Sequence, residues 1–139
     1  MLIEKQDLPM VSVGFMNTIH DEDRKIINTI FEQILKYEVT SSQTNKIKIN
    51  VLFQKWFNHT VKHFSSEEKK MKEKNFPSYA EHKKEHIRAL AEMHTIFSEW
   101  QEKNDILILK TYFTDVLPIW IVEHIETMDV AAAKFFNEH

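Results

Sequence analysis

Residues 78–102 read SYAEHKKEHIRALAEMHTIFSEWQE, and this stretch decides the fold class. Apolar and imidazole side chains recur in it every three or four residues, which is the spacing of one face of an α-helix. The members of this face are Tyr79, His82, His86, Leu90, Met93, Phe97 and Trp100. No glycine or proline interrupts the stretch, so we expect one long helix that buries this face in a core.

Three further segments show the same periodicity. Apolar stripes run through residues 18–37, 49–71 and 109–135, and short polar connections separate them. Asp105 is the expected N-cap of the last segment. Pro118 lies inside that segment and should kink or split the helix, because proline cannot donate the backbone hydrogen bond of a helix interior.

Four long helices with short connections predict an all-α fold, an antiparallel up-down four-helix bundle. The bundle is expected to cover residues 18–139, with residues 1–17 forming an N-terminal arm. The start at Thr18 rests on its Thr-x-x-Asp pattern with Asp21, which resembles a capping box.

The composition agrees with long helices and narrows the chemistry. The 139 residues include only one glycine and three prolines, too few for the tight turns of a β-rich fold. There is no cysteine, which excludes disulfides, thiol catalysis, iron–sulfur clusters and thiolate zinc sites. Histidine and carboxylate remain as metal ligands, and the chain has eight histidines.

Charge and hydropathy argue against two classes of partner. A net charge of −3 and a pI near 6.2 provide no polycationic surface, so no nucleic-acid partner is expected. The longest nearly apolar run, residues 116–122, is far shorter than a bilayer span, so no membrane partner is expected. The first five residues show no signal-peptide pattern, and we therefore expect a cytoplasmic chain.

Five histidines fall on the inward faces of the four segments: His20, His63, His82, His86 and His124. One histidine on an apolar face is usually a hydrogen-bonded core residue. Five that converge from four helices would cost several kcal/mol unless something bound their ring nitrogens. A metal centre removes that cost.

Carboxylates accompany these histidines. Glu67 follows His63 by one helical turn on the same face. Asp129 follows His124 by five residues, which is about 140° around an ideal α-helix, so periodicity alone does not place it in the site. Imidazole and carboxylate donors in this number suit iron better than a four-ligand structural zinc site.

Three motifs, in this order, resemble those of the hemerythrins, and most closely the bacterial single-domain hemerythrins. Residues 63–71 match H-F-x-x-E-E-x-x-M, residues 82–86 match H-x-x-x-H, and residues 120–125 with Asp129 match W-x-x-x-H-I-x-x-x-D. The resemblance covers the chain from about His20 to the C-terminus.

The resemblance implies a non-haem di-iron centre with an oxo or hydroxo bridge. The family's metal ligands fall on His20, His63, Glu67, His82, His86, His124 and Asp129. His82, His86 and His124 would hold one iron, and His20 and His63 would hold the other. The carboxylates Glu67 and Asp129 would bridge the two irons. The second iron would then keep an open position.

The implied function is dioxygen binding for storage, delivery or sensing. The alternative is an enzyme on the same scaffold, a di-iron oxidase, a peroxidase or a nitric-oxide-handling protein. A signalling module whose ligand state alters a protein partner is a third reading. The sequence does not decide whether the chain is an enzyme, and no protein partner is identified.

The residues of the dioxygen pocket bear on that choice. Trp120 matches an aromatic residue near the family's pocket, and two usually apolar positions are occupied here by Asp23 and Thr127. Asp23 could relay protons or fill the open position, and Thr127 could hydrogen-bond a bound ligand; either would favour the enzyme. Alternatively, Asp23 complements the dipole at the helix N-terminus. His59, one turn before His63, is expected to be an outer partner or a surface residue.

Overall fold

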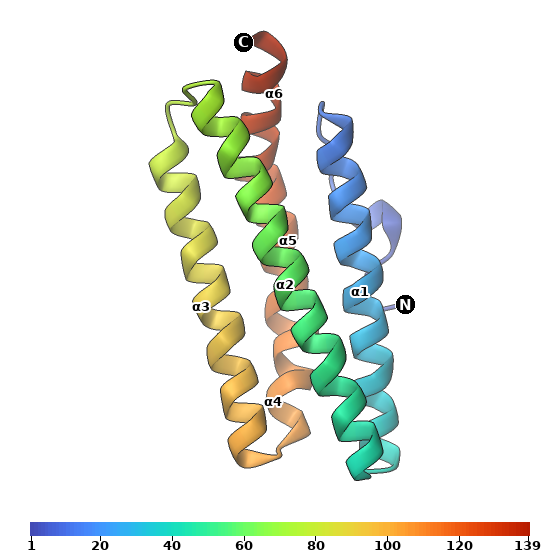
Figure 1. Ribbon diagram of the computed structural model, residues 1–139. Coiled ribbons are helices and arrows are strands. Elements are labelled where there is room, and N and C mark those ends of the chain that lie inside the picture. Colours follow the sequence, from blue (N-terminus) through green and yellow to red (C-terminus); the bar gives the residue numbers. More distant parts are fainter.

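Four long helical segments run alternately up and down the molecule, and the structure contains no strands (Figure 1). The structure is a computed structural model that describes all of residues 1–139. The first three segments are α1 (Gly14–Val39), α2 (Gln43–Glu73) and α3 (Tyr79–Lys103). The prediction of an all-α, antiparallel up-down four-helix bundle is confirmed.

The fourth segment is a continuous rod of five pieces (Figure 1). They are α4 (Ile106–Thr111), the π-helical turn η2 (Tyr112–Val116), α5 (Leu117–His124), the π-helical turn η3 (Ile125–Asp129) and α6 (Val130–Glu138). Asp105 caps α4 as predicted, with its side chain accepting a hydrogen bond from the Leu107 amide. The predicted break at Pro118 is also present, because η2 replaces the regular helix immediately before it.

The start of α1 differs from the prediction. The helix begins at Gly14, four residues before Thr18, and the Thr18 hydroxyl donates to the Gly14 carbonyl oxygen instead of forming a capping box. A preceding short 3-10 helix, η1 (Lys5–Asp7), belongs to the N-terminal arm. The arm is fixed to α1 because Asn28 accepts a hydrogen bond from the Ile3 amide and donates one to its carbonyl oxygen.

The interior consists of a polar layer between two apolar clusters. The larger cluster contains thirteen buried residues, among them Phe53 and Trp56, and the smaller one contains seven, among them Met71. Along α2 these residues come before and after His63 and Glu67, so one helix crosses all three layers. Burial of each large apolar side chain contributes about 1.5–3 kcal/mol to the free energy of folding. The two clusters together hold the polar layer in place.

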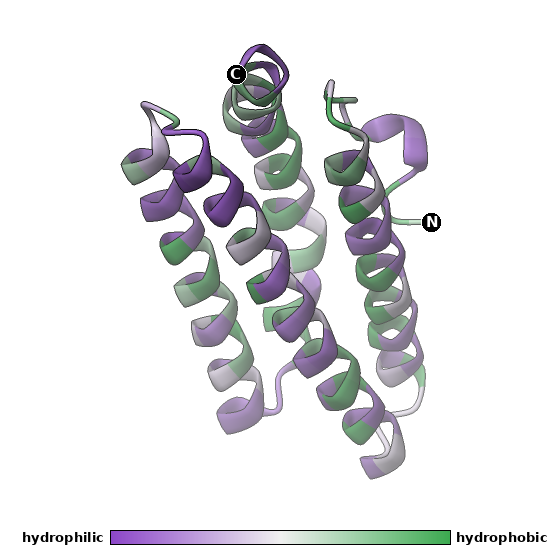
Figure 2. Cartoon of the chain, turned by 45° about the horizontal axis from the view of Figure 1, so that its top comes forward, coloured by the Kyte–Doolittle hydropathy of each residue, from purple (hydrophilic) through white to green (hydrophobic).

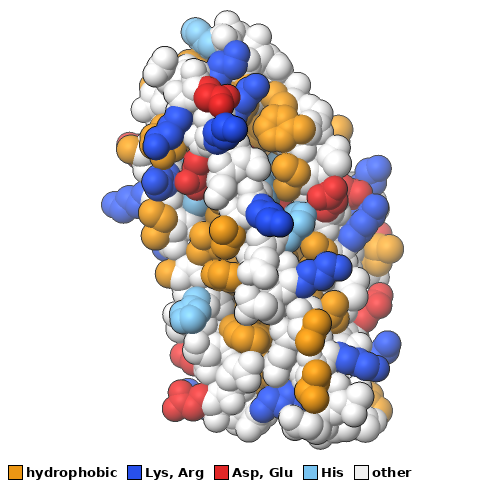
Figure 3. Space-filling model, in the orientation of Figure 1, with side chains coloured by type: hydrophobic (Ala, Val, Ile, Leu, Met, Phe, Trp, Pro, Cys, Tyr) orange, Lys and Arg blue, Asp and Glu red, His pale blue; other side chains and the backbone are white.

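The outer surface is mixed. Hydrophobic and hydrophilic residues alternate along each helix (Figure 2), and on the face shown in Figure 3 cationic and anionic side chains are interspersed. None of the helices combines the length and the hydropathy that a bilayer-spanning segment requires.

Candidate metal centre

The polar layer brings together seven side chains from all four segments. They are His20, His63, Glu67, His82, His86, His124 and Asp129, and each is buried. Glu67 and Asp129 are fully inaccessible to solvent, which is rare for carboxylates unless cationic or metal partners surround them. All five histidine positions that the sequence predicts to face inward do so.

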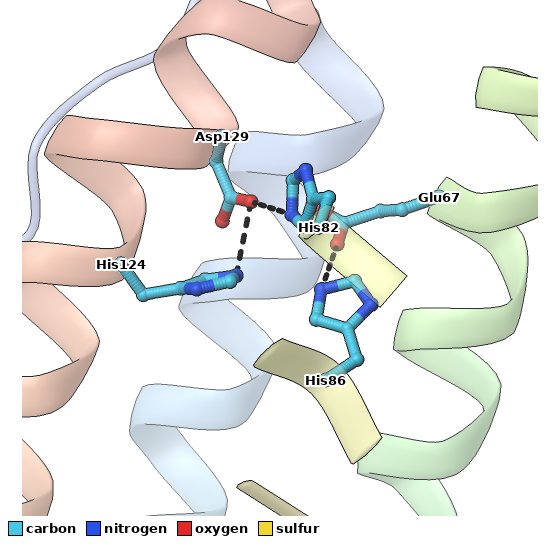
Figure 4. A group of neighbouring side chains, drawn as sticks. All are labelled: Glu67, His82, His86, His124 and Asp129. Carbon is cyan, nitrogen blue, oxygen red and sulfur yellow. Dashed lines mark ion pairs between the residues drawn. The ribbon is translucent and has the colours of Figure 1, made fainter. Parts of the chain in front are cut away.

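Asp129 contacts three imidazoles from three different helices. Its Oδ2 atom lies 3.0 Å from Nε2 of His20. Its Oδ1 atom lies 3.1 Å from Nε2 of His82 and 3.2 Å from Nε2 of His124, the two Asp129 contacts drawn in Figure 4. The two oxygens of this carboxylate therefore face different groups of histidines.

Glu67 divides its oxygens in the same way. Its Oε2 atom lies 3.2 Å from Nε2 of His63, and its Oε1 atom lies 3.4 Å from Nε2 of His86. One oxygen from each carboxylate thus faces the pair His20 and His63. The other oxygen of each faces residues of the trio His82, His86 and His124.

Most of the ligand atoms that face the middle of the polar layer have no hydrogen-bond partner. The atoms without a partner are Nε2 of His63, His82, His86 and His124, both oxygens of Glu67, and Oδ1 of Asp129. A buried polar atom without a partner costs about 1–3 kcal/mol, so such a cluster is unfavourable as a bare core. Five imidazole nitrogens and two carboxylates are metal ligands by chemistry, and their ligand atoms fall into two groups that share Glu67. The residues therefore fit a site for two metal ions.

The π-helical turn η3 explains how Asp129 enters this site. Its hydrogen bond runs from the Val130 amide to the Ile125 carbonyl oxygen, a separation of five residues. The wider turn brings positions i and i+5 towards one face, so Asp129 and His124 lie on the same side of the helix, as their 3.2 Å contact requires. The 140° separation expected for a regular α-helix does not apply here.

Burial and charge act in opposite directions on the carboxylates. Burial alone would raise the pKa of Asp129, but contacts with the His124, His20 and His82 imidazoles hold it well below its usual range. For Glu67, burial and the nearby Asp129 charge raise the pKa, and His63 and His86 overcome both, leaving it lowered. Both carboxylates are therefore held as anions.

His63 responds in the opposite sense. Burial lowers its pKa, but the charges and contacts of Glu67 and Asp23 outweigh burial and raise the pKa well above 6.5. In the absence of metal, His63 is held as a cation between two carboxylates.

A cavity of about 50 Å³ adjoins one side of the polar layer. His20, His63, His124 and Asp129 line it, whereas Glu67, His82 and His86 do not. Much of the remaining lining is apolar and comes from all four segments and the N-terminal arm, including Ile3, Ile27, Trp56, Phe64 and Ile121. The volume is enough for a few water molecules or a diatomic ligand.

Trp120, the aromatic residue that the resemblance placed near a pocket, lies beside this cavity. It lines the cavity, and its ring stacks on His124 with 4.7 Å between ring centroids. Its indole nitrogen donates a hydrogen bond of 2.8 Å to Oε1 of Glu85 on α3.

The proposed pocket role of Thr127 is wrong. Its side chain is exposed, does not line the cavity and donates a hydrogen bond to the Glu123 carbonyl oxygen. The expectation assumed a regular helix, in which a residue three positions after His124 lies beside it. The π-helical turn rotates Thr127 away from the site while bringing Asp129 in.

The position of Asp23 differs from both roles that the sequence suggested for it. It is the tenth residue of α1, beyond the first turn, so the proposal that it complements the helix dipole is wrong. It lines the cavity, but its oxygens face imidazoles: Oδ1 lies 2.7 Å from Nδ1 of His59, and Oδ2 lies 2.7 Å from Nδ1 of His63. His59 is an outer partner, as expected, and the hydrogen bond with Asp23 raises its pKa.

Two neighbours of the site were missed by reasoning from the sequence. Glu68 contacts Nδ1 of His86 through Oε2 at 2.8 Å, and Phe64 stacks on the His86 ring with 3.8 Å between centroids. Both residues belong to the 63–71 motif. Their positions in that motif were the available signal.

The fold and the site together define a class: a four-helix bundle with a buried metal-binding site of histidines and carboxylates. The chain is similar to a bacteriohemerythrin of Aquifex aeolicus (strain VF5), with 26% identity over 135 residues that cover 96% of this chain and 97% of the relative. It is also 26% identical over 118 residues to a bacteriohemerythrin of Methylococcus capsulatus (strain ATCC 33009 / NCIMB 11132 / Bath), covering 85% of this chain and 83% of that relative.

No family model and no solved structure matches the chain. The two similarities extend over most of the bundle, and they support a hemerythrin-like family.

The pKa shifts predict how the stability of the metal-free protein depends on pH. His63 has a raised pKa, so its contribution is complete below about 6.5 and is lost as the pH rises through its folded-state pKa. Glu67 and Asp129 have lowered pKa values, so their contributions are present above 4.5 and 3.8 and are lost as the pH falls further. We therefore expect the melting temperature of chelator-treated protein to be highest between these limits and to fall towards pH 9.

Metal should reverse the trend above neutral pH, because metal binding requires deprotonated imidazoles. The control is the same melting series on metal-loaded protein, whose melting temperature should not fall between pH 6.5 and 8. A metal-free protein that becomes more stable over this range would contradict the assigned charge states.

Proposed function

We propose that this chain is a hemerythrin-like protein that holds two iron ions and binds dioxygen reversibly. The observation that carries the proposal is the orientation of the Glu67 and Asp129 carboxylates. In each of them one oxygen faces one group of histidines and the second oxygen faces the other group. This is the arrangement that two bridging carboxylates require. The similarity to bacteriohemerythrins supports iron as the metal.

In this proposal the two ions have unequal protein ligand sets. His82, His86 and His124 would hold one ion, and His20 and His63 would hold the other. Glu67 and Asp129 would each offer one oxygen to either ion. The second set therefore has one protein ligand fewer, which leaves room for an external ligand.

The position of the cavity agrees with this asymmetry. The cavity is lined by both histidines of the smaller set but by only one of the larger set, His124. An external ligand arriving through the cavity would therefore reach the side with the free position. Two ferrous ions at this site would supply the two electrons that dioxygen takes up when it binds.

Charge compensation is consistent with a buried di-iron centre. Two ferrous ions carry a charge of +4, and the two buried carboxylates with a hydroxide bridge offset most of it. An uncompensated charge in the interior of a bundle would cost several kcal/mol. Glu67 and Asp129 are already held as anions, so they are ready to provide this compensation.

Binding is favoured over catalytic turnover by what surrounds the cavity. Thr127 is outside it, and both oxygens of Asp23 are occupied by imidazoles, so neither provides a free proton donor beside the open position. Most of the other residues that line the cavity are apolar, although Arg24, Arg88 and Glu92 also line it. An oxidase or peroxidase would need a group that delivers protons to the bound ligand.

The first test is metal content. Protein produced with ample iron should contain about two iron ions per chain, because the two ligand groups each hold one. Asp129→Ala should lower this content, since it removes one ligand from each ion. The control is Glu126→Ala, which changes an exposed carboxylate in the same π-helical turn. Wild-type protein that contains one zinc ion and no iron would rule out the di-iron assignment.

The second test is the response to dioxygen. Protein reduced without air should gain visible absorption when air is admitted and lose it when oxygen is removed under vacuum or argon. Repeated cycles should return the same spectra, because neither Thr127 nor Asp23 offers a free proton donor to the bound ligand. A spectrum that changes once and does not return on removal of oxygen would favour the enzyme instead.

A further inference from the structure

A chain of polar contacts connects the surface to the candidate metal centre between α1 and α2. It begins at Glu22, whose Oε2 atom lies 3.1 Å from Nε2 of His59. Nδ1 of His59 lies 2.7 Å from Oδ1 of Asp23, and Oδ2 of Asp23 lies 2.7 Å from Nδ1 of His63. The exposed fraction of the side chains falls along it, from 54% at Glu22 to 6% at His63.

Asp23 is the central member of this chain. Each of its oxygens faces the Nδ1 atom of a different imidazole, so the carboxylate is held from both sides. His59 in turn has a carboxylate at each ring nitrogen. The group is therefore restrained from the surface inwards, and its inner end is the outward-facing nitrogen of His63.

We propose that Asp23 is a positioning residue for His63, and that His59 supports it by fixing the Asp23 carboxylate. A neutral imidazole carries one proton, and an acceptor at Nδ1 keeps that proton there. The lone pair of Nε2 is then free and directed at the metal centre, where Nε2 already lies 3.2 Å from Glu67. This inference rests on the proposed two-metal centre.

In the other group of histidines, Glu68 takes the place that Asp23 has beside His63. Nδ1 of His86 lies 2.8 Å from Oε2 of Glu68, as Nδ1 of His63 lies 2.7 Å from Oδ2 of Asp23, whereas no carboxylate contacts Nδ1 of His20 or Nδ1 of His124. Each candidate ion thus has one histidine anchored by an outer carboxylate. Asp23 serves the ion with only two histidines, so its loss should be felt most at that ion.

The experiment compares Asp23→Leu with Glu68→Leu by titration with Zn²⁺ against a competing chelator. Removing an outer carboxylate of a metal-bound histidine weakens metal binding by on the order of 10–100-fold. Asp23→Leu should lower the affinity for the ion at His20 and His63 by such a factor and leave the affinity for the other ion within about twofold. Glu68→Leu should lower the affinity for the ion at His82, His86 and His124. Glu32→Gln, which changes an exposed carboxylate of α1 outside this chain of contacts, is the control and should change neither affinity.

Nuclear magnetic resonance of the zinc-loaded protein separates positioning from general stability. In the wild type the ring of His63 should show a slowly exchanging Nδ1 proton and a metal-bound Nε2. Asp23→Leu should lose that proton signal while the ring signals of His82 stay unchanged. A merely structural role for Asp23 would weaken both ions equally and disturb both sets of signals, which would overturn the proposal.

His59→Leu provides a second variant because His59 is partly exposed and its loss leaves the polar layer intact. It should accelerate exchange of the His63 Nδ1 proton and weaken the same ion as Asp23→Leu, by a smaller factor. Unchanged exchange and unchanged affinities in this variant would overturn the supporting role of His59. If wild-type protein takes up fewer than two ions, it is the proposed centre itself that fails.

Discussion

The structure depends on two buried carboxylates that are each shared by two groups of imidazoles. Glu67 and Asp129 have no access to solvent, and their oxygens lie 3.0–3.4 Å from the histidine nitrogens around them. Carboxylates at this depth are stable only when cationic groups or metal ions compensate them. The bundle must therefore bring residues from four helices together within a few ångströms, and the apolar clusters on both sides of the polar layer keep them there.

This constraint accounts for one of the two π-helical turns in the fourth segment, and Pro118 accounts for the other. The π-helical turn Ile125–Asp129 is the means by which Asp129 reaches the same side as His124, and the turn at Tyr112–Val116 accommodates Pro118. The N-terminal arm, fixed to α1 through Asn28, contributes Ile3 to the cavity lining. The parts of the chain that depart from regular helix thus lie close to the centre or close the space beside it.

The sequence predicted the bundle and the inward histidines because both follow from 3.6-residue periodicity. It could not place Asp129 from spacing, since a regular helix puts it about 140° from His124, and only the motif indicated it. The same assumption of a regular helix led to the wrong position for Thr127. The contacts of Asp23 with His59 and of Glu68 with His86 join residues 36 and 18 positions apart, and they depend on how neighbouring helices are rotated, which periodicity does not determine.

The most direct test of the shared-carboxylate centre is X-ray absorption at the iron edge of the iron-loaded protein. Two ions that share Glu67 and Asp129 must lie close together, so the spectrum should show an iron neighbour at about 4 Å or less, together with nitrogen and oxygen ligands. Iron with imidazole and carboxylate ligands but no second iron at that distance would contradict the account.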